Sequence, residues 1–265
     1  MLAFGQALPA VTAVSPSSGA IGGGTSVTIT GVSLAGATAV HFGAAAATAY
    51  SVNSSTSITA TSPAGSGSVD VTVTTPSGTS PTGSGDRFTY RPAPTVGKLS
   101  AKGGPASGGT SVTITGTELS GATSVEFGGV PATQFTVVSA TTITAVSPAH
   151  VAGTTDVRIT SGSGGSAIST KDRFKYTPMV EGFSPSNGPF AGGISVVISG
   201  VGFVTGASGT SFKFGKAKAK SVQCTSATTC TVLLPAQSAP GSVEVRATAN
   251  KASTIAGSGA HFTYE

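Results

Sequence analysis

The strongest constraint on this chain is a set of short motifs that recur three times in the same order. SVTITG at residues 26–31 returns 85 residues later and, as SVVISG, after a further 84 residues. GDRFTY at 85–90 likewise returns as KDRFKY and GAHFTY. Solenoid repeats span about 20–50 residues, whereas a unit of this length is enough for a small domain with its own core. The sequence therefore predicts three similar domains.

The connectors between these repeats are short and contain proline. We place an N-terminal extension and three domains at residues 1–8, 9–91, 92–177 and 178–265. The joints read RPAP at 91–94 and TP at 177–178. Because proline stiffens a short linker, we expect semi-rigid joints and a rod of three domains.

Each repeat has the two-residue period of a half-buried strand. In SVTITG, Val27 and Ile29 alternate with small polar residues. β-Branched residues dominate, Gly, Pro, Ser and Asn interrupt them every 8–12 residues, and no segment has helical periodicity. The paired glycines Gly23 and Gly24 predict a turn with positive φ before this strand. The sequence thus predicts an all-β chain with a β-sandwich of six or seven strands in each repeat.

Composition excludes several classes of function. The net charge of +5 is not gathered into a long block of Lys or Arg, which argues against a nucleic-acid partner. No apolar run approaches the ~18 residues that would span a membrane. The first nine residues lack the basic segment of a signal peptide, which leaves the compartment open.

Residues that could support catalysis are scattered. His41, His150 and His261 fall at different places in the three repeats and accompany no nucleophile motif. The nine acidic residues form no calcium-loop pattern. We therefore expect no enzyme activity, no cofactor and no metal.

The repeats resemble a known family. SPSSGAIGGGTSVTITG at 15–31, followed by VHFG at 40–43, is similar to the IPT/TIG domain, and SPSNGPFAGGISVVISG at 184–200 repeats it. The second copy keeps most of this motif but has Ala101 where the others have proline. The resemblance implies three tandem immunoglobulin-like β-sandwiches. It also implies no catalysis, because such domains occur in receptors, transcription factors, glycosyltransferase accessory regions and bacterial surface proteins.

The tandem arrangement and the Gly-, Ala- and Thr-rich composition of the repeats are most similar to those of the family members in bacterial surface proteins. This resemblance implies an extracellular structural or adhesive protein, either a stalk or a filament subunit. The alternative is an accessory module that binds a carbohydrate or a wall polymer. That alternative predicts an exposed aromatic platform, yet the chain has no Trp and four Tyr. A Rel-like nucleic-acid binder is favoured less, because basic residues are sparse and because the expected disulfide does not suit a reduced, cytosolic chain.

Two cysteines carry the clearest indication of compartment. Cys224 and Cys230 align with apolar residues of the other repeats, Val52 and Ile58 in the first. If these positions face each other across a hairpin, the two thiols are close enough to bond. We predict a Cys224–Cys230 disulfide and hence an oxidising compartment, with two buried free thiols as the alternative.

A run of lysines in the third repeat has two interpretations. The segment KFGKAKAK contains Lys213, Lys216, Lys218 and Lys220, and the last three alternate as if on one face of a strand. These lysines could bind a polyanion such as an anionic glycan. Alternatively, they protect an edge strand against pairing with another sheet.

The N-terminal extension is more apolar than expected for a terminal segment that makes no contacts. Leu2, Phe4 and Leu8 could form an intersubunit contact by adding to the sheet edge of a second copy, which would build a filament. The alternative is a leftover linker.

Overall fold

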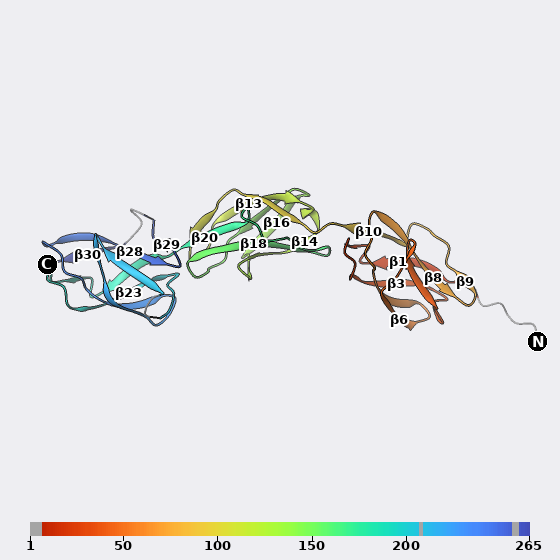
Figure 1. Cartoon of the computed structure of the whole chain (residues 1–265), viewed down its shortest axis with the longest axis horizontal. Helices are drawn as coiled ribbons and strands as arrows, with labels where there is room; N and C mark the ends of the chain where they lie inside the picture. The colour runs from red at the N-terminus through yellow and green to blue at the C-terminus, as the bar shows by residue number, and fades with distance from the viewer. Residues whose placement is uncertain (1–6, 207–208, 256–259) are drawn as a thin grey trace, which may run out of the picture.

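The computed structural model describes residues 7–206, 209–255 and 260–265. Three β-sandwiches follow one another along a single axis, with the first and the third at opposite ends (Figure 1). The predicted all-β, three-domain rod is confirmed. We call the units domains 1, 2 and 3 in chain order.

Each domain repeats one topology of a four-stranded and a six-stranded sheet. In domain 1 the four-stranded sheet has the order β1 (Ala10–Ser15), β3 (Ser26–Val32), β7 (Ser57–Thr61), β6 (Ala49–Ser54). The facing sheet has the order β2 (Ser18–Ala20), β10 (Arg87–Arg91), β8 (Ser68–Thr75), β4 (Ala39–Phe42), β5 (Ala45–Ala46), and β9 (Gly78–Thr79) also pairs with β8. The β2–β10 pair is parallel and the other pairs are antiparallel.

Domain 2 has the same arrangement. Its four-stranded sheet is β11 (Thr95–Leu99), β13 (Ser111–Thr117), β17 (Thr142–Val146), β16 (Gln134–Ser139). Its six-stranded sheet is β12 (Gly103–Pro105), β20 (Arg173–Thr177), β18 (Gly153–Ser161), β14 (Ala122–Phe127), β15 (Val130–Pro131), with β19 (Gly164–Gly165) paired to β18. A short 3-10 turn, η1, covers Leu119–Gly121.

Domain 3 completes the series. Its four-stranded sheet is β21 (Met179–Ser184), β23 (Ser195–Val201), β27 (Thr229–Leu233), β26 (Lys220–Cys224). Its six-stranded sheet is β22 (Asn187–Gly188), β30 (His261–Tyr264), β28 (Gly241–Ala249), β24 (Thr210–Phe214), β25 (Ala217–Lys218), with β29 (Ala252–Ser253) paired to β28.

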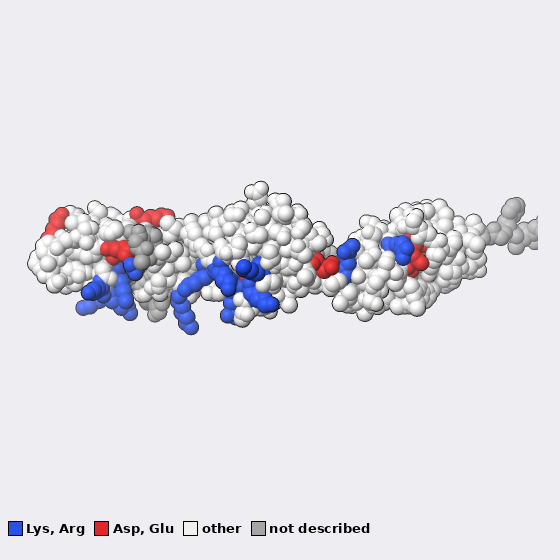
Figure 2. All heavy atoms as spheres, turned by 90° about the horizontal axis from the view of Figure 1, so that it is seen from above, with Lys and Arg blue, Asp and Glu red and all other residues white. Residues whose placement is uncertain are grey.

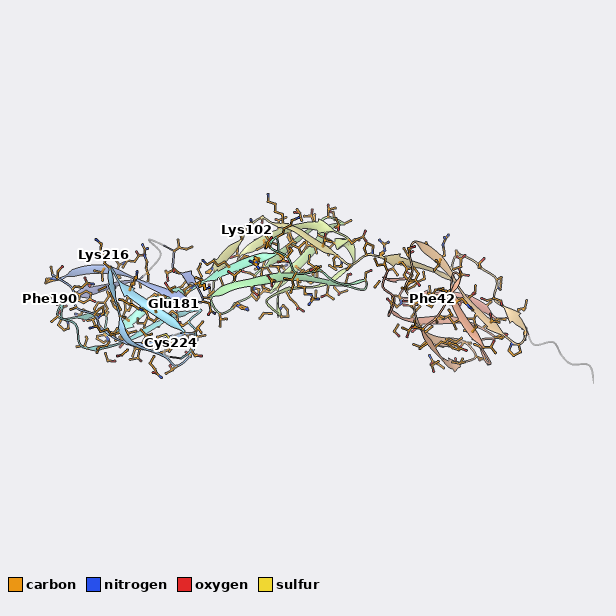
Figure 3. All side chains as sticks on the ribbon, in the orientation of Figure 1. Phe42, Lys102, Glu181, Phe190, Lys216 and Cys224 are labelled. Carbon is orange, nitrogen blue, oxygen red and sulfur yellow. A yellow bond between two sulfur atoms is a disulfide. The ribbon has the colours of Figure 1, made fainter. Side chains whose placement is uncertain are left out.

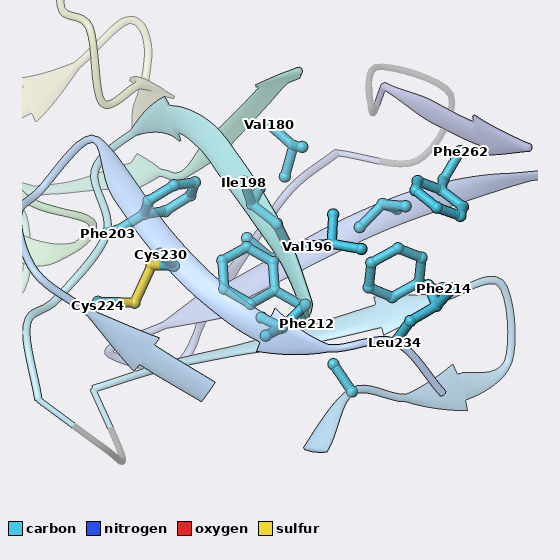
Figure 4. Packing of buried hydrophobic residues seen from close by; sticks show 14 of the residues in the cluster. Val180, Val196, Ile198, Phe203, Phe212, Phe214, Cys224, Cys230, Leu234 and Phe262 are labelled. Atoms are coloured by element: carbon cyan, nitrogen blue, oxygen red, sulfur yellow. A yellow bond between two sulfur atoms is a disulfide. The ribbon is translucent and has the colours of Figure 1, made fainter. Parts of the chain in front are cut away.

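The cores form where the alternating apolar residues of the two sheets meet. Val27 and Ile29 are fully buried, and Ile29 pairs with Ile58 on the neighbouring strand. An aromatic ring from β4 meets one from β10: Phe42 and Phe88 pack edge to face with centroids 5.1 Å apart. This geometry suits the aromatic quadrupoles. In domain 3 the same kind of packing joins Phe214 and Phe262 (Figure 4).

The last strand of each domain ends on a tyrosine that is part of the core. Tyr90, Tyr176 and Tyr264 are all buried. Because burial disfavours the phenolate, it raises the pKa of Tyr176 to about 12 and raises the pKa values of the other two tyrosines as well.

The predicted glycine turn is confirmed. Gly23 and Gly24 have φ of 76° and 81°. A Cβ on Gly23 would lie 2.5 Å from the carbonyl carbon of Pro63, whereas one on Gly24 would meet nothing within 4 Å. Gly23 is therefore required both by its positive φ and by the lack of room for a side chain, whereas Gly24 is required by its positive φ alone.

Candidate functional site

The two cysteines lie opposite each other on the β26–β27 hairpin. Cys224 and Cys230 are a cross-strand pair, and their sulfur atoms form a disulfide (Figure 4). Both residues are buried against the core of domain 3. The bond thus replaces the aliphatic contact that Val52 and Ile58 make in the same register in domain 1.

The four predicted lysines are all exposed, but they do not share one strand. Lys213 belongs to β24, Lys216 to the following turn and Lys218 to the edge strand β25, all on the six-stranded sheet. Lys220 begins β26 in the other sheet. Placing the last three on one face of a single strand is therefore wrong. The chain crosses between sheets at the buried Ala219, and alternation in the sequence continues through that crossing unchanged.

A third cation lies in register with two of these lysines. Across neighbouring strands, Lys213 pairs with Lys218 on one side and with Arg246 of β28 on the other. Outward residues of adjacent strands are about 4.8 Å apart, so these three side chains form a short row. We call Lys213, Lys218 and Arg246 the cationic row. Arg246 could not be predicted from the sequence, because it is 33 residues from Lys213 and no local pattern links the two.

One carboxylate supports the cationic row. Glu244, two residues before Arg246 on β28, accepts hydrogen bonds from the guanidinium at 2.7 and 2.9 Å. A hollow of about 460 Å³ is lined here by Lys213, Gly215, Lys216, Glu244 and Arg246. Figure 3 shows Lys216 at the surface of domain 3, and in Figure 2 the basic side chains of this domain project to one side. Together with Lys218, the cations here number four, and with the one carboxylate of Glu244 the local net charge is +3.

Domains 2 and 3 meet through small, closely packed residues. The Ala152 N–H donates to the carbonyl of Gly202 at 3.1 Å, and the Asn250 side chain donates to the carbonyl of Ala152 at 2.9 Å. Ala152 is fully buried against Ala249 and Ala252. The hairpin turn between β28 and β29 therefore docks onto the end of domain 2.

Gly202 is essential to the geometry of this joint. Its φ is 77°, and an added Cβ would lie 2.3 Å from the Cβ of Ala106 in domain 2. The equivalent positions in the other domains, Ser33 and Glu118, also have positive φ but carry side chains. Only the third domain thus allows its neighbour to approach this closely.

Domains 1 and 2 meet more loosely. Arg91 and Glu118 form an ion pair of 3.6 Å in which both side chains are at least one-third exposed. A hollow of about 260 Å³ separates the two domains here, lined by Ser18, Arg91, Pro92, Glu118, Ser120, Gly121, Ser161, Gly162 and Ser163. Exposed ion pairs contribute at most about 1 kcal/mol, so this ion pair adds little to the stability of the joint.

The predicted N-terminal contact falls mostly outside the described residues. Leu2 and Phe4 lie among residues that the structure does not describe, so their role stays a prediction. Leu8 is 56% exposed and lies beside Gly78 in domain 1.

Buried acidic groups in the first two domains are engaged in structure. Asp86 accepts from the Gly83 N–H at 2.8 Å, and Asp172 accepts from the Ser169 N–H at 2.7 Å. Each fixes the loop that leads into the last strand. Within the described residues, no three His, Cys, Asp or Glu side chains gather to hold a metal, and no helix could span a membrane.

No curated protein matches the sequence of this chain significantly. Among solved structures, the extracellular region of plexin A4 is similar, with 20% identity over 99% of this chain and a TM-score of 0.49. The chain spans 25% of that plexin chain. The surface glycan-binding protein PbSGBP-B from Prevotella bryantii shares 17% identity over 66% of this chain and 42% of its own, with a TM-score of 0.43.

The Escherichia coli adhesin FdeC shares 14% identity over 98% of both chains, with a TM-score of 0.26. The model of the IPT/TIG domain matches residues 9–90, 94–176 and 178–264, which together make up nearly the whole chain. The chain therefore belongs to the IPT/TIG domain family, with three tandem copies.

Proposed function

We propose that this chain is a non-enzymatic extracellular spacer. It would act as a stalk segment that keeps whatever is attached at its two ends a set distance apart. The observation that carries the proposal is the joint between domains 2 and 3. A hydrogen bond from Ala152 to Gly202 and a buried alanine cluster hold two complete domains end to end. A joint of this kind transmits direction from one domain to the next, which a flexible linker cannot do.

The two joints differ, and this difference defines the spacer. Domains 2 and 3 form one stiff segment, whereas the open contact of Arg91 with Glu118 lets domain 1 pivot. In such a stalk, domain 1 can change its orientation while the segment of domains 2 and 3 keeps its length.

An extracellular location is supported by the Cys224–Cys230 disulfide, since such bonds persist in oxidising compartments. Antibodies against domain 3 should label intact cells of the source organism. Labelling that requires permeabilised cells would contradict this location.

The shape is tested by small-angle X-ray scattering of the whole chain. A compact protein of this length has a radius of gyration of about 18 Å, whereas three touching domains in a row give about 28 Å. A value near the compact limit would overturn the spacer.

The stiff joint is tested by Gly202→Glu. Glutamate occupies the equivalent position of domain 2 as Glu118, so domain 3 should still fold. The new side chain cannot coexist with Ala106, and the joint should open. We expect scattering to show a broader range of shapes, and the joint to become sensitive to protease. Ser33→Glu, at the same position of domain 1 and outside both joints, is the matched control and should change neither readout.

Filament formation through Leu2, Phe4 and Leu8 remains a separate prediction, tested by electron microscopy with and without residues 1–8. A carbohydrate module with an aromatic platform is less supported. Among the described residues, the exposed large aromatic side chains are Tyr50 in domain 1 and Phe190 at the far end of domain 3 (Figure 3).

A further inference from the structure

The cationic row is an unfavourable arrangement for a purely structural sheet. Lys213 faces Lys218 and Arg246 on the two neighbouring strands, and like charges directly opposite each other destabilise a sheet. Glu244 offsets one of the three charges. Two lysines therefore remain side by side with no carboxylate between them in the row.

The same three positions in the other domains carry no such concentration of charge. Domain 1 has Ala46, His41 and Thr72 in the corresponding register. Domain 2 has Pro131, Glu126 and Arg158, in which the two charges oppose each other. The fold does not require cations at these positions, and only the third copy gathers them.

Protection of sheet edges accounts for only part of the pattern. Lys218 lies on the edge strand β25 and Lys220 on the edge strand β26, where lysine discourages pairing with another sheet. Lys213 and Arg246 lie on β24 and β28, which have neighbours on both sides. An edge function gives no reason for cations there.

We infer that the cationic row, together with Lys216, is a binding site for a linear anionic polysaccharide, whose carboxylate or sulfate groups the ammonium and guanidinium groups would contact. The row spans two strand spacings, about 10 Å, and opens onto the shallow hollow beside Lys216. A surface of this length suits several anionic groups of one polymer better than a single small ion. Glu244 orients the Arg246 guanidinium and leaves the lysines available.

A single-stranded nucleic acid fits this surface less well. Such ligands stack their bases on exposed aromatic side chains between the cations. The aromatic residues of β24, Phe212 and Phe214, are fully buried in the core on the opposite face of the strand. The row offers charge without a stacking surface.

The test compares two double variants of the whole chain that lower the net charge equally. Lys213→Gln/Lys218→Gln removes two members of the row. Lys98→Gln/Lys102→Gln is the control, since both of its lysines are exposed and lie in domain 2, outside the row. Binding to heparin, to alginate, to neutral dextran and to single-stranded DNA is measured by calorimetry at 50 and 200 mM salt, and circular dichroism verifies folding.

We expect heparin to bind the wild-type chain, dextran not to bind, and the row variant to bind about tenfold more weakly than the control variant. If alginate binds as well, carboxylate groups are sufficient for binding. If only heparin binds, sulfate groups are required. Equal weakening in both variants, no binding to either polyanion, or tighter binding of single-stranded DNA would each overturn the inference. Aggregation of the row variant by light scattering, with binding unchanged, would assign these lysines to edge protection instead.

Discussion

Loss of the Cys224–Cys230 disulfide should destabilise domain 3 and leave domains 1 and 2 unchanged. The two cysteines are six residues apart and close the β26–β27 hairpin. In the other domains the same cross-strand pair is Val52 with Ile58 and Val137 with Ile143. The chain thus contains its own reference for the hairpin without a covalent bond.

The size of the effect follows from the short loop. In the chain-entropy model, closing a loop of six residues stabilises the folded state by about 2 kcal/mol, because the unfolded hairpin loses freedom. For a domain of this size, about 2 kcal/mol corresponds to roughly 10 °C in Tm. The double variant Cys224→Val/Cys230→Ile removes this contribution but fills the buried space with the side chains that domains 1 and 2 use.

The assay is differential scanning calorimetry of the intact chain with and without reductant. We expect reductant to lower one transition of the wild type by about 10 °C. The Val/Ile variant should begin near that lower value and should not respond to reductant. A wild-type profile that reductant leaves unchanged, or a shift in the transitions of domains 1 and 2, would refute this reasoning.

Two further predictions concern single residues. Gly24→Ala should cost about 1 kcal/mol from its positive φ alone, whereas Gly23→Ala should cost about 3 kcal/mol, because its Cβ would also overlap the backbone of Pro63. Equal losses in urea unfolding would show that the overlap has no effect. Alkaline pH should destabilise domain 2: the pKa of Tyr176 is raised from 10 to about 12, so its contribution is complete below pH 10 and falls as pH rises toward 12. Tyr176→Phe should flatten this dependence, and an unchanged alkaline slope would contradict the assignment.

Local patterns of the sequence predicted the main strands, the glycine turn and the disulfide. They did not predict the strands of two or three residues that bring each domain to ten described strands instead of six or seven. Alternation in SVTITG predicted that Val27 and Ile29 would be buried, because successive side chains of a strand point to opposite faces. The positive φ of Gly23 and the facing positions of Cys224 and Cys230 followed from neighbours close in sequence. Alternation misled at Lys216–Lys220, since a crossing between two sheets preserves a two-residue pattern.

The sequence by itself thus determined that three similar β-sandwiches form, because short-range periodicity and glycine conformation are written in neighbouring residues. Only the tertiary structure decided what lies side by side across strands and domains. It brought Arg246 next to Lys213, and Ala152 of domain 2 against Gly202 of domain 3. The physical reason is that strand register and domain contact depend on side-chain packing between segments distant in the chain, which no local pattern encodes.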